Sequence, residues 1–314
     1  MLSRVAERIY WAARYLERAE NTARLVSVYD NLLFDLPRDT NISWYNLIII
    51  NSTSESFHER YKIEDEHNVV KFLLADDTNP GSLLSTLRFL RENLRTTRDV
   101  VPKDIWEFIN ELDMYARQHI QQGINRTQRH AFLNTIIKGC QEINGLLGGT
   151  MSRDAAWQFV VLGRNIERAD MTSRILDAGT FTMLQPRSHV SVNLGQVVWG
   201  NVLRSLSADL NYRRAVRSSV NAHKVARFLI EDSQFPRTVS FCINELKQAC
   251  FHLPNPDSVL GAIDHVSQLS YHLNGADELS AEFRDYLNAL QIQLCTINDA
   301  IADNWFNFSQ GDAA

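Results

Sequence analysis

The sequence has few residues that interrupt a helix. Only 13 glycines and 7 prolines occur among its 314 residues, and most of them separate long stretches in which apolar residues recur at i, i+3, i+4 and i+7. This spacing is typical of amphipathic helices, and helices are the only element that the pattern supports. The sequence therefore predicts an all-α fold, a helical bundle of about twelve helices. The predicted breaks include Leu36-Pro37, Gly148-Gly149 and Gln185-Pro186, and Ser82, Asp154 and Thr238 are predicted to start helices.

Long apolar runs and an excess of positive charge are also missing. The longest purely aliphatic run, Leu47 to Ile50, is far too short to span a membrane, and the first ten residues are charged where a signal peptide would be apolar. The formal net charge of -5 gives no global positive field for nucleic acid or an anionic membrane. We expect a cytoplasmic protein that binds neither, so that any anion site is local.

The common catalytic and metal-binding motifs are absent. The sequence contains no H-E-x-x-H, G-x-x-x-x-G-K or G-x-S-x-G. The four cysteines show no C-x-x-C spacing, which predicts buried thiols in place of a zinc site or a redox dithiol: Cys140, Cys242, Cys250 and Cys295. We therefore expect no metal and no directly bound cofactor.

Two Glu-x-x-His pairs each have the spacing of half of a di-iron site. Glu55 and His58 have the required spacing, as do Glu64 and His67 nine residues later. The two pairs flank a polar break and cannot face each other across a bundle core. Asp76 and Asp77 likewise fit an acidic loop before a helix better than a magnesium site.

The most informative feature is internal repetition. Residues 13–24 align with residues 163–174 at an offset of 150, and a later series that begins at His67 aligns with one that begins at His223. The identical positions of the first copy are Arg14, Glu17, Arg18, Ala19, Thr22 and Arg24. The sequence thus predicts a tandem duplication of a six-helix unit, residues 1–150 and 151–314, with pseudo-two-fold symmetry. Because no long linker separates them, the units should pack as one continuous body.

The repeated helix is apolar on nearly all sides, which predicts an interior position for its charged residues. A buried carboxylate must be paired, so Glu17 and Glu167 each need an arginine or a ligand. One interpretation is a structural Glu-Arg lattice that locks the units together. The other is a central cleft in which arginines bind carboxylate or phosphate oxygens and the glutamates orient them. Its lining residues would be Arg14, Arg18, Asn21, Arg164 and Arg168.

A second basic feature lies between residues 88 and 98. Arg88, Arg91, Arg95 and Arg98 are spaced by three, four and three residues, which places them on one helix face. Like charges in a row repel unless acidic groups answer them. The stripe could contribute to an anion site, or form a solvated face that is paired with Glu92 and nearby acidic residues.

Several segments together resemble the bacterial alpha-E family of helical proteins, which is named for an ER motif. They are the Tyr-Trp-Ala-Ala-Arg-Tyr-Leu-Glu-Arg-Ala-Glu-Asn start, Asn-Pro-Gly-Ser, Arg-Glu-Asn-Leu-Arg, Leu-Gly-Arg-Asn-Ile-Glu-Arg-Ala and Phe-Pro-Arg-Thr-Val. By position, the ER motif falls on Glu17-Arg18 and Glu167-Arg168, and the arginine-rich segment on Arg91, Glu92, Asn93, Arg95 and Arg98. Leu94 and Thr96-Thr97 stand where small residues are more usual.

The resemblance implies two kinds of protein partner: circularly permuted ATP-grasp proteins and transglutaminase-like peptidases. It also implies a role in making or processing amide bonds, with ATP and Mg²⁺ handled by a partner. We expect an accessory protein that presents an anionic small molecule or peptide to an ATP-grasp ligase. Two alternatives stay open: an enzyme with Glu17 or Glu167 as general base, and a purely structural scaffold.

Overall fold

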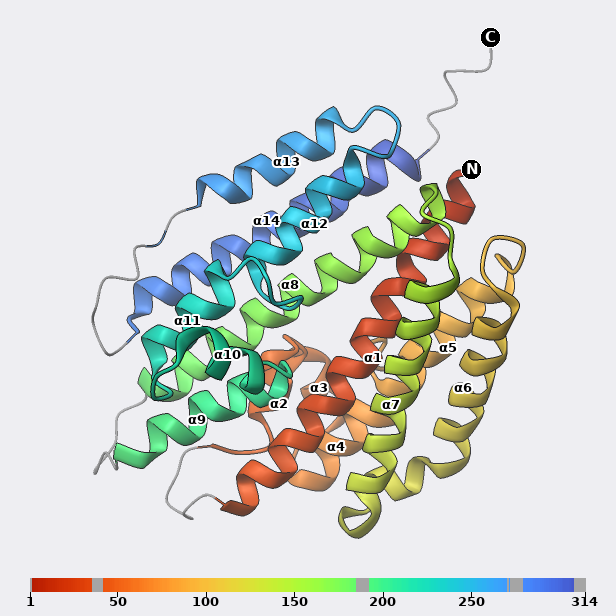
Figure 1. The fold of residues 1–314 in the computed structure, drawn as a ribbon. Coiled ribbons are helices and arrows are strands. Elements are labelled where there is room, and N and C mark those ends of the chain that lie inside the picture. The colour runs from red at the N-terminus through yellow and green to blue at the C-terminus, as the bar shows by residue number, and fades with distance from the viewer. Residues whose placement is uncertain (1, 36–41, 185–191, 270, 272–278, 308–314) are drawn as a thin grey trace.

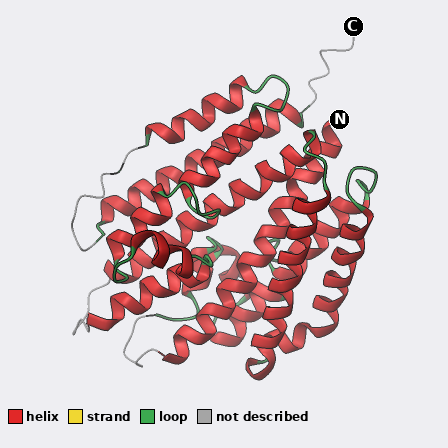
Figure 2. Cartoon of the chain, viewed as in Figure 1, coloured by secondary structure: helices red, strands yellow, loops and turns green. Residues whose placement is uncertain are grey.

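The computed structural model describes residues 2–35, 42–184, 192–269, 271 and 279–307. All regular secondary structure in these residues is helical (Figure 2), which confirms the all-α prediction. The helices of the first half are α1 (Ser3–Asp35), α2 (Asn46–Ile50), α3 (Ser54–Arg60), α4 (Glu66–Leu74), α5 (Leu83–Arg95), α6 (Lys103–Ile124) and α7 (Arg126–Thr150). Those of the second half are α8 (Ala155–Leu184), α9 (Val192–Ser205), α10 (Asp209–Val216), α11 (Ala222–Glu231), α12 (Val239–Cys250), α13 (Asp257–Gln268) and α14 (Ala281–Trp305).

The described residues thus form fourteen helices where the sequence predicted about twelve. The additional elements are short ones such as α2, which is formed by the aliphatic run Leu47 to Ile50, and α3, a seven-residue helix in a mostly polar stretch. The predicted break at Gly148-Gly149 is displaced, because α7 continues through both glycines and ends at Thr150. Other predicted breaks, at Leu36-Pro37 and Gln185-Pro186, involve residues outside the described ranges.

Side chains that accept backbone hydrogen bonds start several helices where the sequence predicted them. Ser82 accepts from the Ser85 N–H at 3.3 Å to begin α5, and Thr238 accepts from Phe241 at 3.3 Å to begin α12. Asp154 accepts from the Ala156 N–H at 3.0 Å just before α8. Each satisfies an N–H that has no partner within its own helix.

The long helices α1 and α8 occupy the middle of the molecule (Figure 1). Helix α1 packs against α5 and α7, and α8 packs against α12 and α14. Outside them, α6 packs on α5 and α7, while α13 packs on α12 and α14. The two central helices also pack extensively on each other. This explains why each is apolar on nearly all sides, as an interior helix must be.

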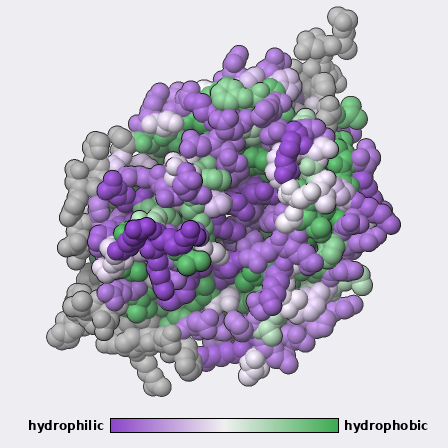
Figure 3. All heavy atoms as spheres, viewed as in Figure 1, coloured by the Kyte–Doolittle hydropathy of each residue, from purple (hydrophilic) through white to green (hydrophobic). Residues whose placement is uncertain are grey.

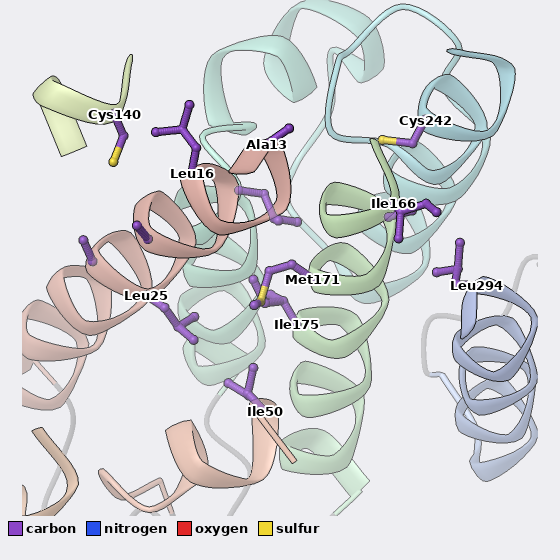
Figure 4. Close-up of a cluster of buried hydrophobic side chains, with 14 of the residues drawn as sticks. Ala13, Leu16, Leu25, Ile50, Cys140, Ile166, Met171, Ile175, Cys242 and Leu294 are labelled. Carbon is purple, nitrogen blue, oxygen red and sulfur yellow. The ribbon is translucent and has the colours of Figure 1, made fainter. Parts of the chain in front are cut away.

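The contact between α1 and α8 has an apolar core. Leu25 of α1 lies with Met171 and Ile175 of α8 and with Ile50 between the two helices (Figure 4). Cys140 from α7 and Cys242 from α12 extend this core outwards, and both are buried. The expectation of buried thiols was wrong for Cys295, which is exposed on α14. Within the described residues, none of the helices is both long and apolar enough to cross a membrane.

The backbones of α1 and α8 come closest at Gly163. A Cβ atom built on this glycine would lie 2.3 Å from the carbonyl oxygen of Tyr10 and 3.2 Å from the Cβ of Ala13. Only a residue without a side chain permits this distance. Gly163 therefore fixes how near α8 comes to α1, directly before Arg164 and four residues before Glu167.

We predict that Gly163→Ala lowers the free energy of unfolding by about 2 kcal/mol, because the added methyl group forces the two helices apart. The matched control is Gly145→Ala on α7, where a Cβ atom would meet nothing within 4 Å. That change should stabilise the protein by about 0.5–1 kcal/mol through helix propensity. Urea unfolding of both variants measures the difference. Equal effects of the two substitutions would show that the α1–α8 contact is not tight at Gly163.

Candidate functional site

The repeated Glu-Arg pairs meet where α1 and α8 cross, and they exchange partners. Glu167 of α8 accepts hydrogen bonds from two arginines of α1. Arg14 Nε lies 2.9 Å from Oε2, and Arg18 binds with both Nε, 2.6 Å from Oε1, and Nη2, 2.9 Å from Oε2. Arg18 therefore holds the carboxylate in the bidentate geometry for which guanidinium is suited.

Glu17 of α1 is paired with α8 in return. Arg168 Nη2 donates to Glu17 Oε1 at 2.6 Å, and Arg164 Nε lies 3.9 Å from the same oxygen. Each glutamate is thus neutralised by arginines of the other motif, not by the arginine that follows it in sequence. Both carboxylates are deeply buried, with side-chain exposures of 0% for Glu17 and 3% for Glu167.

The segment before α12 adds an arginine that was not among the predicted site residues. Arg237, just before α12, places Nη1 3.4 Å from Glu17 Oε2. It also donates to Asn21 Oδ1 at 2.9 Å and to Glu20 Oε1 at 3.0 Å, and Glu20 in turn accepts from Arg24 at 2.6 Å. The Phe-Pro-Arg-Thr-Val segment that contributed to the family resemblance contains Arg237, so the signal was present.

Helix α14 completes the other end of the cluster. Asn298 Oδ1 accepts from Arg14 Nη1 at 2.7 Å and from the Tyr10 hydroxyl at 2.8 Å. No pattern in the sequence indicated Asn298. Its contribution depends on the packing of α14 against α1 and α8.

The resulting set of buried charges is not neutral. We call it the Glu-Arg network and define it by its ion-paired members: Arg14, Arg18, Arg24, Arg164, Arg168, Arg237, Glu17, Glu20 and Glu167. Six arginines against three glutamates leave an excess of three positive charges. In a protein of net charge -5, this is a local concentration of positive charge at the centre of the fold.

The arginines keep both glutamates ionised. Burial raises the pKa of Glu17, but Arg168, Arg237 and Arg164 outweigh it and lower the pKa to about 2. Burial likewise raises the pKa of Glu167, while Arg18 and Arg14 bring it down to about 2. A carboxylate with so low a pKa is a weak proton acceptor at neutral pH.

The two ends of the network differ in how completely they are satisfied. Both oxygens of Glu167 accept hydrogen bonds. Around Glu17, by contrast, four buried polar atoms have no hydrogen-bond partner among the described residues: Glu17 Oε2, Asn144 Oδ1, Arg164 Nη2 and Arg168 Nε. Unpartnered buried polar atoms are rare and costly, so this end of the network is less completely satisfied than the Glu167 end.

Arg164 is the least neutralised arginine of the network. Burial and the nearby charge of Arg168 lower its pKa to about 10, and the attraction of Glu17 across 3.9 Å does not compensate. The guanidinium still carries its charge at neutral pH. The side chains of Arg164 and Arg168 are each 15% exposed, so solvent reaches the Glu17 end of the network.

The arginine stripe lies in other surroundings. Helix α5 ends at Arg95, so the prediction that all four arginines share one helix face was wrong for Arg98, which lies in the turn that follows. Arg91 donates to Asn110 at 2.7 Å and to Glu92 at 3.0 Å, Arg95 pairs with Glu92 at 2.9 Å, and Arg98 stacks on the Trp106 ring at 3.9 Å. Among the described residues, no hydrogen bond or ion pair joins the stripe to the Glu-Arg network. The structure thus brings together Arg14, Arg18, Asn21, Arg164 and Arg168, but not Arg91, Arg95 and Arg98.

The described residues form no cluster of metal-binding side chains. Within the described ranges, no group of three or more His, Cys, Asp or Glu side chains is arranged to hold a metal ion. The arrangement that is present places guanidinium groups in partial excess around fixed carboxylates, and guanidinium is chemically suited to oxyanions.

The glutamates should make stability depend on acid pH. Because their pKa values fall from 4.5 in the unfolded chain to about 2 in the folded one, their contribution is complete above pH 4.5 and is lost as the pH falls towards 2. We predict that Glu167→Gln removes about 3 kcal/mol of this acid dependence. Exposed Glu92→Gln is the control and should leave the profile unchanged. Chemical denaturation between pH 2 and 6 tests this, and parallel profiles for Glu167→Gln and the parent protein would contradict it.

Two kinds of comparison identify relatives of the chain. An uncharacterized protein of Mycobacterium bovis is 22% identical over 326 aligned residues, which cover 95% of this chain and 36% of the relative. An uncharacterized protein of Mycobacterium tuberculosis is 21% identical with the same coverage. The chain therefore spans about 36% of the length of these relatives. No solved structure matches it.

The family comparison points to the residues that form the network. The matching family model spans residues 1–306, so it includes both Glu17-Arg18 and Glu167-Arg168. The family is described as a predicted alpha-helical domain with a conserved ER motif, and the helical fold and the crossed Glu-Arg pairs agree with that description. The chain belongs to the alpha-E family.

Proposed function

We propose that this protein is an accessory, anion-binding component of an ATP-grasp amide ligase system. The observation that carries the proposal is the excess of three positive charges in the Glu-Arg network, together with the unpartnered Arg164 Nη2 and Arg168 Nε. A carboxylate or an acyl phosphate would supply both the missing negative charge and the missing acceptors. The natural ligand is then the anionic group of a peptide or amino-acid substrate.

The same proposal assigns ATP and Mg²⁺ to a partner. A circularly permuted ATP-grasp protein would carry out the activation, with a transglutaminase-like peptidase acting in the same system. The resemblance of the sequence motifs supports these partners, and a cytoplasmic location follows from them. This chain would hold the anionic group while the partner forms or processes the amide bond.

We also propose that the network arose by tandem duplication of a unit that ended near residue 150. The offset of 150 between the two ER motifs supports this. So does the matching arrangement of the two halves: α5 and α7 pack on α1 with α6 outside them, and α12 and α14 pack on α8 with α13 outside them. Duplication would explain the exchange of partners between the motifs. It would also explain how one end could diverge to bind a ligand while the other kept a structural role.

Of the two alternatives, a structural scaffold is favoured by one observation and a general-base enzyme by none. The complete pairing of Glu167 with Arg14 and Arg18 is what a structural lock requires. The pKa of about 2 for both glutamates opposes a role as general base. The scaffold account leaves the excess positive charge at the Glu17 end unexplained.

Arg164→Gln separates anion binding from architecture. Arg164 is repelled by nearby arginines and has no carboxylate oxygen closer than 3.9 Å, so its removal should leave the free energy of unfolding unchanged or raise it by about 1 kcal/mol. Calorimetry with inorganic phosphate, ATP, amino acids and short acidic peptides should show saturable binding to the parent protein. We predict that the variant loses at least about tenfold in affinity, which corresponds to about 1.4 kcal/mol.

The matched control is Arg174→Gln on the same helix. Arg174 is paired with Asp170 at 2.7 Å, so its loss should leave anion binding unchanged. If the parent protein binds no anion, and Arg164→Gln unfolds several kcal/mol more easily, the network is architecture and the proposed function is wrong.

A further inference from the structure

A second concentration of positive charge lies away from the Glu-Arg network, between α10 and α11. These helices and residues 232–235 surround two open hollows of about 470 and 520 Å³. The hollows share Ala215, Phe228 and Asp232, so they form one continuous depression, the α10–α11 groove. Figure 3 shows strongly hydrophilic residues over α10 on this face of the molecule.

Only some of the basic residues in the groove have a carboxylate partner among the described residues. Arg227 pairs with Glu231 at 2.9 Å. Asp232 uses its Oδ1 to accept the backbone N–H groups of Gln234 and Phe235 at 2.9 and 2.8 Å. The side chains of Arg214, Arg217 and Lys224 also line the groove, and among the described residues none of them has a carboxylate partner.

Helix ends account for only some of these charges. Arg214 lies in the last turn of α10 and Arg217 at its C-cap, where the helix dipole favours positive charge, although Arg213 of the same turn is already paired with Asp209 at 2.9 Å. Lys224 lies in the first turn of α11, where positive charge is unfavourable, and that turn contains no acidic residue. Its position in the groove therefore points to an external negative charge.

The floor of the groove is apolar. The rings of Phe228 and Phe235 stack with centroids 5.9 Å apart and an angle of 23° between their planes. Both hollows reach Phe228, and the first also reaches Phe235. Both phenylalanines are largely buried, with exposures of 5% and 9%, so a ligand in the groove would meet a small aromatic surface below and positive charges at the sides.

We propose that the α10–α11 groove binds an acidic segment of a partner polypeptide. Carboxylates of that segment pair with Arg214, Arg217 and Lys224, and an apolar side chain packs over Phe228 and Phe235. A polypeptide fits better than a nucleic acid because Glu231 and Asp232 border the groove and would repel a continuous phosphate backbone. The groove shares no residue with the Glu-Arg network, so this binding is independent of the proposed anion site.

Fluorescence anisotropy with the full chain tests the groove directly. The probe is a labelled peptide of about twelve residues that alternates glutamate with leucine and phenylalanine, and a peptide with lysine in place of glutamate is its control. We expect saturable binding of the acidic probe only, weakened by raising the salt concentration. The double variant Arg214→Glu, Arg217→Glu should lower the affinity at least about tenfold.

Arg213→Glu is the matched control, because Arg213 is on α10 but does not line either hollow. It should change the affinity less than about twofold if the groove, and not the general charge of α10, makes the contact. Arg164→Gln should leave probe binding intact even if it abolishes anion binding. Absence of saturable binding to the parent protein, or an equal loss in Arg213→Glu, would overturn the proposal. Tight binding of single-stranded nucleic acid in preference to the acidic peptide would overturn it as well.

Discussion

The crossed ion pairs between α1 and α8 are the constraint on which the rest of the structure depends. Two carboxylates are held in the interior, and each is stabilised by arginines that reach it from the other helix. A buried carboxylate without its partner would cost several kcal/mol, so neither helix can shift along the other without leaving a buried carboxylate unpaired. The close backbone contact at Gly163 fixes the helices at the one separation where both pairs form.

Beyond this symmetrical exchange, the network is asymmetric in a way that matters for function. Around Glu167 the donors and acceptors match, and α14 adds Asn298 to hold Arg14. Arginines outnumber carboxylates at both ends, but not equally. Arg14 and Arg18 share Glu167, an excess of one charge, while four arginines share Glu17 and Glu20, an excess of two: Arg24, Arg164, Arg168 and Arg237. A lattice that served only stability would be expected to balance its charges, because each unpaired buried charge is a cost. The imbalance is what favours a ligand at the Glu17 end.

The sequence predicted the helical class, the interior position of the repeated helix and the burial of its glutamates, because apolar residues on every face leave no other place for them. It also identified five of the residues that gather there. It did not predict the exchange of partners, since spacing along a helix shows which residues share a face but not which helix opposes that face. Asn298 was missed for the same reason, whereas Arg237 stands in the Phe-Pro-Arg-Thr-Val segment of the family resemblance but lies before α12, outside the repeated helix. The arginine stripe was linked to the site although α6 supplies its partners in Trp106 and Asn110.

The central claim is that each glutamate is paired with the arginine of the other motif, and a double-mutant cycle measures this pairing most directly. One cycle combines Glu167→Gln with Arg18→Gln, and the other combines Glu167→Gln with Arg168→Gln, the next residue in sequence. The account predicts a coupling free energy of about 1–3 kcal/mol for Glu167 with Arg18 and a value near zero for Glu167 with Arg168. Coupling to Arg168 as large as that to Arg18 would contradict the crossed arrangement.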